Sequence, residues 1–308
     1  MANNERIKKI NLAEIRKFGN IEFLAHQLVE GFITGLHKSP YHGFSVEFAE
    51  HRLYNTGEST RHIDWKVFGK TDRLYTKRYE EETNLRCRIL LDVSSSMYYP
   101  EKDFGKLTFS IMAAASLTYL LQKQRDAIGI TTFSNQIEYT SPIKSTSGHI
   151  HTQFLQLENL LKEPAREKKT EIAQVLHLLA DKIGKRSLVI IFTDMFENVE
   201  EKDKLFSALQ HLKHNKHEVL LFHIFDSGTE LDFQFDDKPY IFTDLESGEK
   251  VKVNPNQIRD FYQKSIKSYF TEIKLKAGQY GIDFIEADIQ KGYEQILQAF
   301  LIKRTKMR

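Results

Sequence analysis

The sequence has 308 residues, with 44 lysines and arginines against 42 aspartates and glutamates and a net charge of +2. This length allows one large α/β domain with a smaller elaboration, and the balanced charge creates no field that favours a nucleic-acid partner. A single cysteine, Cys87, excludes an internal disulfide and indicates a reducing compartment. The sequence shows neither a signal peptide nor an apolar window of about 20 residues, which predicts a cytoplasmic protein without a membrane span.

Residues 1–86 predict an N-terminal α+β extension that packs on the main domain. Apolar residues recur at helical spacing over 21–36, and short strands with turns at Gly57 and Gly69 are expected after it. The extension is rich in arginine, aromatic and acidic residues, and we expect them to form ion pairs that fasten it to the main domain, with a partner-binding surface as the alternative. The residues concerned include Arg52, Arg61, Asp64 and Trp65, the last being expected as a packing anchor.

Residues 87–308 alternate apolar strands with helical stretches. This pattern predicts a doubly wound, mostly parallel central sheet with helices on both faces, as in Rossmann-like α/β folds. A hairpin insertion is expected at 231–253, turning at 246–249. The expected strands are 88–91, 127–133, 137–140, 187–194, 218–225 and 282–286, and the expected helices are 104–124, 150–161, 171–183, 200–214, 256–276 and 293–302.

Two of these apolar strands end in an aspartate, Asp92 and Asp194. In a doubly wound sheet, functional groups gather at the carboxyl ends of the strands near the point where the strand order reverses. If the two strands are neighbours, their carboxylates repel each other unless a cation lies between them. Ser94 and Ser96 would add neutral oxygens, giving the oxygen-only donor set that Mg²⁺ prefers. The alternative for the serines is a solvated turn with helix-capping hydroxyls.

A third hydroxyl is expected from Thr170, which stands just before a predicted helix; Thr146 and Thr152 lie on other plausible loops. The set D92-V-S-S-S96, Thr170 and T193-D194 resembles the metal-ion-dependent adhesion site of von Willebrand factor type A domains. The preceding segments, R52-L-Y-N-T-G-E-S-T-R-H-I-D-W-K66 and L74-Y-T-K-R-Y-E-E-E82, resemble the bacterial domain-of-unknown-function 58 family.

The resemblance implies a binding module with a metal site formed by Asp92, Ser94, Ser96, Thr170 and Asp194. In such sites the hydroxyls contact the metal directly, the aspartates bind it directly or through water, and a carboxylate from a protein partner fills the open position. Mg²⁺ is the expected ion, with Mn²⁺ or Ca²⁺ as alternatives. The family further implies an adaptor that works with a MoxR-type AAA+ ATPase in chaperone-like assembly or maturation of other proteins.

An enzyme is the alternative function class, in the form of a metal-dependent phosphoester hydrolase with Asp92 as nucleophile. That chemistry requires a second acid two residues later, where the sequence has Ser94, so we expect no enzyme. Gly69-Lys70-Thr71 and Gly105-Lys106 lack the upstream glycine of a phosphate-binding loop, and no G-x-S-x-G motif surrounds the serines. The histidines of 211–217 are expected at a solvated helix end and not at a metal site.

Overall fold

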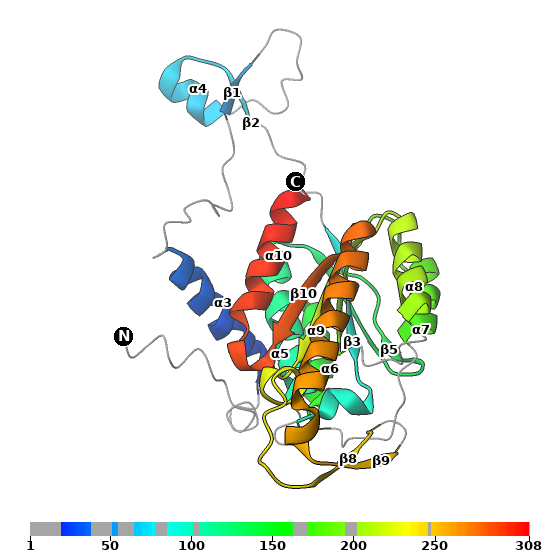
Figure 1. Ribbon diagram of the computed structural model, residues 1–308. Helices are drawn as coiled ribbons and strands as arrows, with labels where there is room; N and C mark the ends of the chain where they lie inside the picture. The colour runs from blue at the N-terminus through cyan, green and yellow to red at the C-terminus, as the bar shows by residue number, and fades with distance from the viewer. Residues whose placement is uncertain are drawn as a thin grey trace. The chain divides into compact units, whose positions relative to one another are not determined.

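The computed structural model describes residues 20–37, 51–54, 65–77, 85–100, 105–162, 172–194, 202–245 and 248–307 (Figure 1). The chain divides into two compact units, one within 1–33 and 85–308 and the other within 34–84. Thr170, Arg61 and Asp64 lie outside the described residues. The predictions made for these three residues therefore stay predictions.

The larger unit contains a six-stranded sheet with the order β10-β7-β6-β3-β4-β5. All neighbouring strands are parallel except β4 and β5, which are antiparallel. The predicted mostly parallel central sheet is therefore confirmed, and the short edge strand is its antiparallel member. Long apolar runs form these strands because both faces of the sheet are covered. The strands are β3 (Arg86–Asp92), β4 (Ala127–Phe133), β5 (Ile137–Thr140), β6 (Leu188–Thr193), β7 (Glu218–Phe225) and β10 (Asp283–Asp288).

Helices cover both faces of the sheet, as the doubly wound pattern predicts (Figure 1). One buried cluster joins the sheet to the first group of helices, and a second cluster joins the opposite face to the second group. The first group is α3 (Ile21–His37), α5 (Gly105–Lys123), α6 (Ser147–Leu160) and α10 (Glu294–Lys306). The second group is α7 (Ile172–Lys182), α8 (Lys202–His214) and α9 (Pro255–Gln279).

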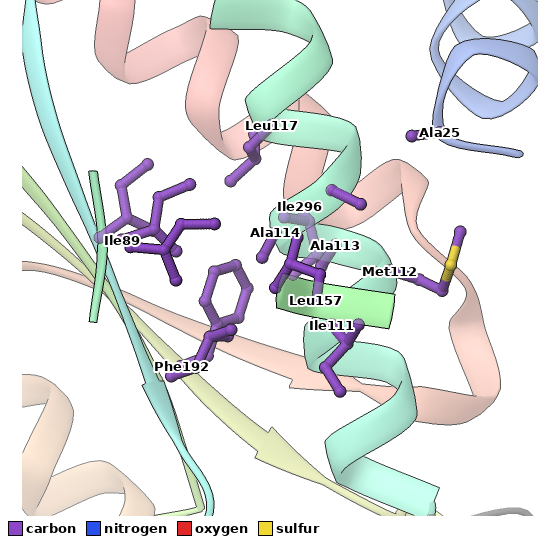
Figure 2. Close-up of a cluster of buried hydrophobic side chains, with 14 of the residues drawn as sticks. Ala25, Ile89, Ile111, Met112, Ala113, Ala114, Leu117, Leu157, Phe192 and Ile296 are labelled. Carbon is purple, nitrogen blue, oxygen red and sulfur yellow. The ribbon is translucent and has the colours of Figure 1, made fainter. Parts of the chain in front are cut away.

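Small residues let α5 approach the sheet closely. Figure 2 shows Ala113 and Ala114 of this helix facing Ile89 of β3 and Phe192 of β6 across the first buried cluster. Successive strand residues point to opposite faces, so Ile89 belongs to this cluster while its neighbour Leu90 belongs to the other. The carboxyl ends of β3 and β6 are thus held between two packed layers.

Helix α3 belongs to the sheet unit as far as Ile33, whereas the sequence placed all of residues 1–86 in the extension. Its apolar stripe is buried in the first cluster, and Glu30 contacts Lys123 of α5 with 2.6 Å between the carboxylate and the ammonium. The amphipathic pattern was recognised, but a pattern does not say which surface covers the apolar stripe. The other unit contains β1 (His51–Leu53), which pairs antiparallel with β2 (Tyr75–Lys77), and α4 (Trp65–Thr71).

Within the smaller unit, Trp65 makes an edge-to-face contact with Phe68, and its role as a packing anchor against the main domain stays a prediction. In the sheet unit, β8 (Tyr240–Thr243) and β9 (Lys250–Val253) form an antiparallel hairpin inside the segment where an insertion was predicted. The described residues of this unit also include the short helical turns η2 (Ser95–Tyr98), η5 (Ser227–Leu231) and η6 (Ile289–Lys291). Across the described ranges, no helix is both long enough and apolar enough to cross a membrane.

Candidate metal centre

Asp92 ends β3 at the point where the strand order reverses. From β3 the chain runs outward to β4 and β5, then returns to β6 on the other side of β3 and continues to β7 and β10. Leu91 of β3 pairs with Phe192 of β6, which places Asp92 beside Thr193. Two carboxyl ends therefore meet at this switch point, where a doubly wound sheet places its functional groups.

Both carboxylate oxygens of Asp92 are held in place. The Thr193 hydroxyl donates to Asp92 Oδ2 at 2.7 Å, and the Ser94 backbone N–H donates to Asp92 Oδ1 at 2.9 Å. The side chain is fully buried. These contacts fix the direction of the carboxylate and leave it with neutral donors only.

Ser94 and Ser96 follow Asp92 on a tight turn that opens into η2. Their hydroxyl oxygens lie 3.1 Å apart. Ser94 is the N-cap residue of η2, but its side chain makes no capping hydrogen bond. The alternative prediction of a helix-capping hydroxyl is therefore wrong for Ser94. Mg²⁺ holds its ligands at 2.0–2.1 Å in octahedral geometry, which separates neighbouring ligand oxygens by about 2.9 Å. The serine pair fits this spacing.

Asp194 lies one residue beyond β6 and meets a buried lysine. Lys106 Nζ lies 2.8 Å from Asp194 Oδ2 and 2.6 Å from Glu230 Oε1, and Lys106 is only 1% exposed. Glu230 is fixed in turn, because its second oxygen accepts the Asp226 backbone N–H at 2.7 Å. The Asp194 side of the centre is therefore a buried ion triad.

Gly105 explains how α5 delivers Lys106 to this place. The helix begins against the turn that contains Pro100, and the Lys106 backbone N–H donates to the Tyr99 carbonyl at 3.0 Å. Gly105 has φ +21°, and a Cβ added there would lie 2.3 Å from Pro100 Cδ. Only glycine tolerates such an approach, so this position fixes the start of the helix and the direction of its first lysine.

The pKa values of Asp92 and Lys106 are both raised, but for different reasons. Burial, and after it the charge of Asp194, raise the pKa of Asp92 to about 7, against the hydrogen bonds from Ser94 and Thr193 that lower it. Burial lowers the pKa of Lys106, but the charges and hydrogen bonds of Asp194 and Glu230 outweigh it and raise the pKa above its ordinary value. Near neutral pH, a cation at Asp92 therefore displaces a proton when it binds.

The donor chemistry fits a hard divalent cation. Within the ranges that the structure describes, no three His, Cys, Asp or Glu side chains form a metal-binding group. A cation between Asp92 and Asp194 would thus complete its shell with hydroxyl and water oxygens, which Mg²⁺ accepts readily. The structure brings Asp92, Ser94 and Ser96 together. Asp194 comes directly after Thr193, the residue of the neighbouring strand whose hydroxyl contacts Asp92.

Three residues that contribute to the centre were not predicted from the sequence. Thr193 directly precedes the predicted ligand Asp194, but its hydroxyl was not expected to contact Asp92. Lys106 carried a signal, since it is the only charged residue in the otherwise uncharged run 105–122. Glu230 carried none, because only the tertiary fold brings η5 to α5. Of the alternative threonines, Thr152 is exposed and donates its hydroxyl to the Gly148 carbonyl of its own helix.

The fold and the carboxylate-ended strands define a Rossmann-like α/β protein with a polar centre at its switch point. The chain belongs to the DUF58 family, described as "Protein of unknown function DUF58", whose model matches residues 50–270.

Similar proteins include the uncharacterized proteins Rv1480 of Mycobacterium tuberculosis and Mb1516 of Mycobacterium bovis, each 22% identical over 206 residues. The match covers 67% of this chain and 63% of each relative. Among solved structures, the conserved hypothetical protein BatB from Bacteroides thetaiotaomicron is 14% identical with a TM-score of 0.45, covering 73% of this chain and 100% of that one. An aerotolerance-related membrane protein from Bacteroides fragilis is 15% identical with a TM-score of 0.40, covering 71% and 99%.

Proposed function

We propose that this chain is a metal-dependent protein-binding module of the von Willebrand factor type A kind, with a metal-ion-dependent adhesion site at the switch point. Asp92, Ser94, Ser96 and Asp194 would hold Mg²⁺, with Mn²⁺ or Ca²⁺ as alternatives, and Thr170 would add a third hydroxyl. The observation that carries the proposal is the pair of serine hydroxyls 3.1 Å apart beside the buried Asp92.

The bound ion would supply a Lewis-acidic position that accepts an Asp or Glu carboxylate from a partner. The protein's own residues set the charge of that position. Lys106 is shared between Asp194 and Glu230, so the triad keeps one net negative charge, and together with Asp92 it would balance a divalent ion. An incoming carboxylate would therefore be held by direct coordination at the open position of the ion. Thr193 and the Ser94 backbone hold Asp92 so that its oxygens need no reorganisation.

The family resemblance extends the proposal to partners. We infer an adaptor that joins client proteins to a MoxR-type AAA+ ATPase during chaperone-like assembly or maturation. The support is the arginine- and tyrosine-rich signature of residues 52–66 and 74–82, together with membership of the family.

Binding is favoured over phosphoester hydrolysis. Ser94 occupies the position of the required second acid. Turnover of a generic phosphate ester by the purified protein, lost in Asp92→Asn, would replace the binding proposal with the enzymatic one.

A pull-down tests the binding proposal. The tagged chain is incubated with lysate of its source organism in Mg²⁺ or in EDTA, and captured proteins are identified by mass spectrometry. We expect an AAA+ ATPase and client proteins to be captured in Mg²⁺ only, and to be lost in Asp92→Ala and Ser96→Ala. Ser116→Ala is the matched control, because that buried hydroxyl donates only within its own helix, to the Met112 carbonyl. Identical captures in Mg²⁺ and EDTA would contradict the proposal.

A further inference from the structure

Two histidines that the proposed metal centre does not use face each other across the packed helices α7 and α8. His177 Nδ1 lies 3.2 Å from His211 Nδ1, and the ring centroids are 5.4 Å apart with the planes tilted by 44°. His211 is 31% exposed, so water reaches the pair. The sequence assigned His211 to a solvated helix end, and the structure pairs it instead with a residue of the neighbouring helix.

A carboxylate sets the tautomer of one ring. Asp181 stands one turn after His177 on α7, and its Oδ1 lies 3.2 Å from His211 Nε2. In the neutral ring, the Nε2–H group donates to Asp181, which leaves the lone pair of His211 on Nδ1, toward His177. A carboxylate that binds the far nitrogen of an imidazole is the usual outer partner of a metal-bound histidine.

The spacing of the two nitrogens suits a metal ion. Imidazole nitrogens bind Zn²⁺ at 2.0–2.1 Å in tetrahedral geometry, so two such ligands are about 3.3 Å apart. The observed 3.2 Å therefore needs little change in the positions of the two nitrogens. The lone pairs must turn from the line between the rings toward one point beside it, and the terminal χ2 torsion of histidine is soft enough for that rotation.

We propose that His177 and His211 form a second metal site, specific for a borderline divalent ion such as Zn²⁺, Ni²⁺ or Cu²⁺, with Asp181 orienting His211. Imidazole selects these ions, whereas the oxygen-only centre at Asp92 selects Mg²⁺. Since no third His, Cys, Asp or Glu joins the pair among the described residues, water completes the shell. The ion ties α7 to α8 from the surface.

Titration calorimetry of the full chain with Zn²⁺, in excess Mg²⁺ so that the oxygen site is occupied, tests the inference. We expect one Zn²⁺ per chain, with binding lost in His177→Gln and in His211→Gln and weakened about 10- to 100-fold in Asp181→Asn. Circular dichroism verifies that each variant is folded. If one glutamine variant does not fold, the other together with Asp181→Asn still decides the result.

The matched control is His151→Gln. His151 Nδ1 lies 3.0 Å from Glu22 Oε2, so it is an exposed histidine with a carboxylate partner, and no second imidazole is bonded to it in the described part of the chain. Its loss leaves Zn²⁺ binding unchanged if the pair across α7 and α8 is the site. Absence of Zn²⁺ binding by the wild type would overturn the inference, as would equal affinity in wild type and His177→Gln. A neutral hydrogen bond between the rings is then the whole role of the pair.

Discussion

The two sides of the candidate metal centre hold their aspartates by different means. Asp92 is held by a hydroxyl and a backbone N–H, which are neutral, whereas Asp194 is held by the ammonium of Lys106. The buried Asp92 carboxylate has only neutral donors, so its pKa is raised and a bound cation would stabilise its charged form. Asp194 already has a buried ammonium beside it and gains less from a second cation. Under the proposed metal-dependent function, the Asp92 side would recruit the ion and the Lys106 ammonium would limit the total negative charge on the Asp194 side.

Removing the buried cation is the strongest way to break this comparison. Lys106→Met leaves Asp194 and Glu230 buried without their common partner, and breaking a buried ion pair in this way costs about 3–5 kcal/mol. We expect the free energy of unfolding in urea to fall by that amount.

Lys123→Met is the matched control on the same helix. Its ion pair with Glu30 is exposed, with side chains 46% and 38% accessible, and such pairs contribute about 0–1 kcal/mol. Equal losses in the two variants would mean that the Lys106 triad adds nothing beyond a surface pair.

The pH dependence of stability tests the Asp92 side. The pKa of Asp92 rises from 3.8 to about 7 on folding, so between those values the unfolded chain loses a proton that the folded chain keeps. The metal-free protein therefore loses stability as pH rises through this window, by about 1.4 kcal/mol per pH unit at most, and the contribution is constant outside it.

Asp92→Asn removes this contribution. The difference in unfolding free energy between variant and wild type, measured in EDTA, should grow in favour of the variant from pH 4 to pH 7 and then level off. A difference that does not change with pH would show that Asp92 titrates normally in the folded protein.

Thr193→Val is expected to have an intermediate effect. Valine keeps the volume of threonine but removes the hydroxyl that donates to Asp92 Oδ2. Hydrogen bonds to charged groups contribute about 1.5–3 kcal/mol, so at pH 8 we expect a loss near the lower end of that range. The loss should shrink at pH 5, where Asp92 is protonated. A loss that is the same at both pH values would assign Thr193 a packing role only.

The smallest expected effect concerns His223, which pairs with Thr193 across β6 and β7. Its ring is buried among Phe225, Phe270 and Phe284, and neither ring nitrogen has a hydrogen-bond partner among the described residues. Burial lowers its pKa from 6.5 to about 4, so the folded protein loses stability as pH falls through that window. His223→Phe should stabilise the protein by about 1 kcal/mol more at pH 6 than at pH 8, as measured by chemical denaturation. An equal effect of the substitution at the two pH values would contradict this.

The sequence predicted the features that depend on local pattern. The apolar runs before Asp92 and Asp194 identified two buried parallel strands, and their neighbouring positions followed from the rules of doubly wound sheets. Contacts between distant segments were not predictable. Lys106 meets Glu230 across 124 residues of sequence, and His177 meets His211 across 34. His217, expected at a solvated helix end, is fully buried and accepts the Ser187 backbone N–H.

The central claim is that the turn after β3 forms half of a divalent-cation site. Calorimetric titration of the metal-free chain with Mg²⁺ at pH 8 tests it most directly, comparing the wild type with the double variant Ser94→Ala, Ser96→Ala. The account predicts one Mg²⁺ per chain in the wild type and at least about tenfold weaker binding in the double variant, with the Ser116→Ala control unchanged. Equal Mg²⁺ affinity in the wild type and the double variant, or no binding by either, would contradict it.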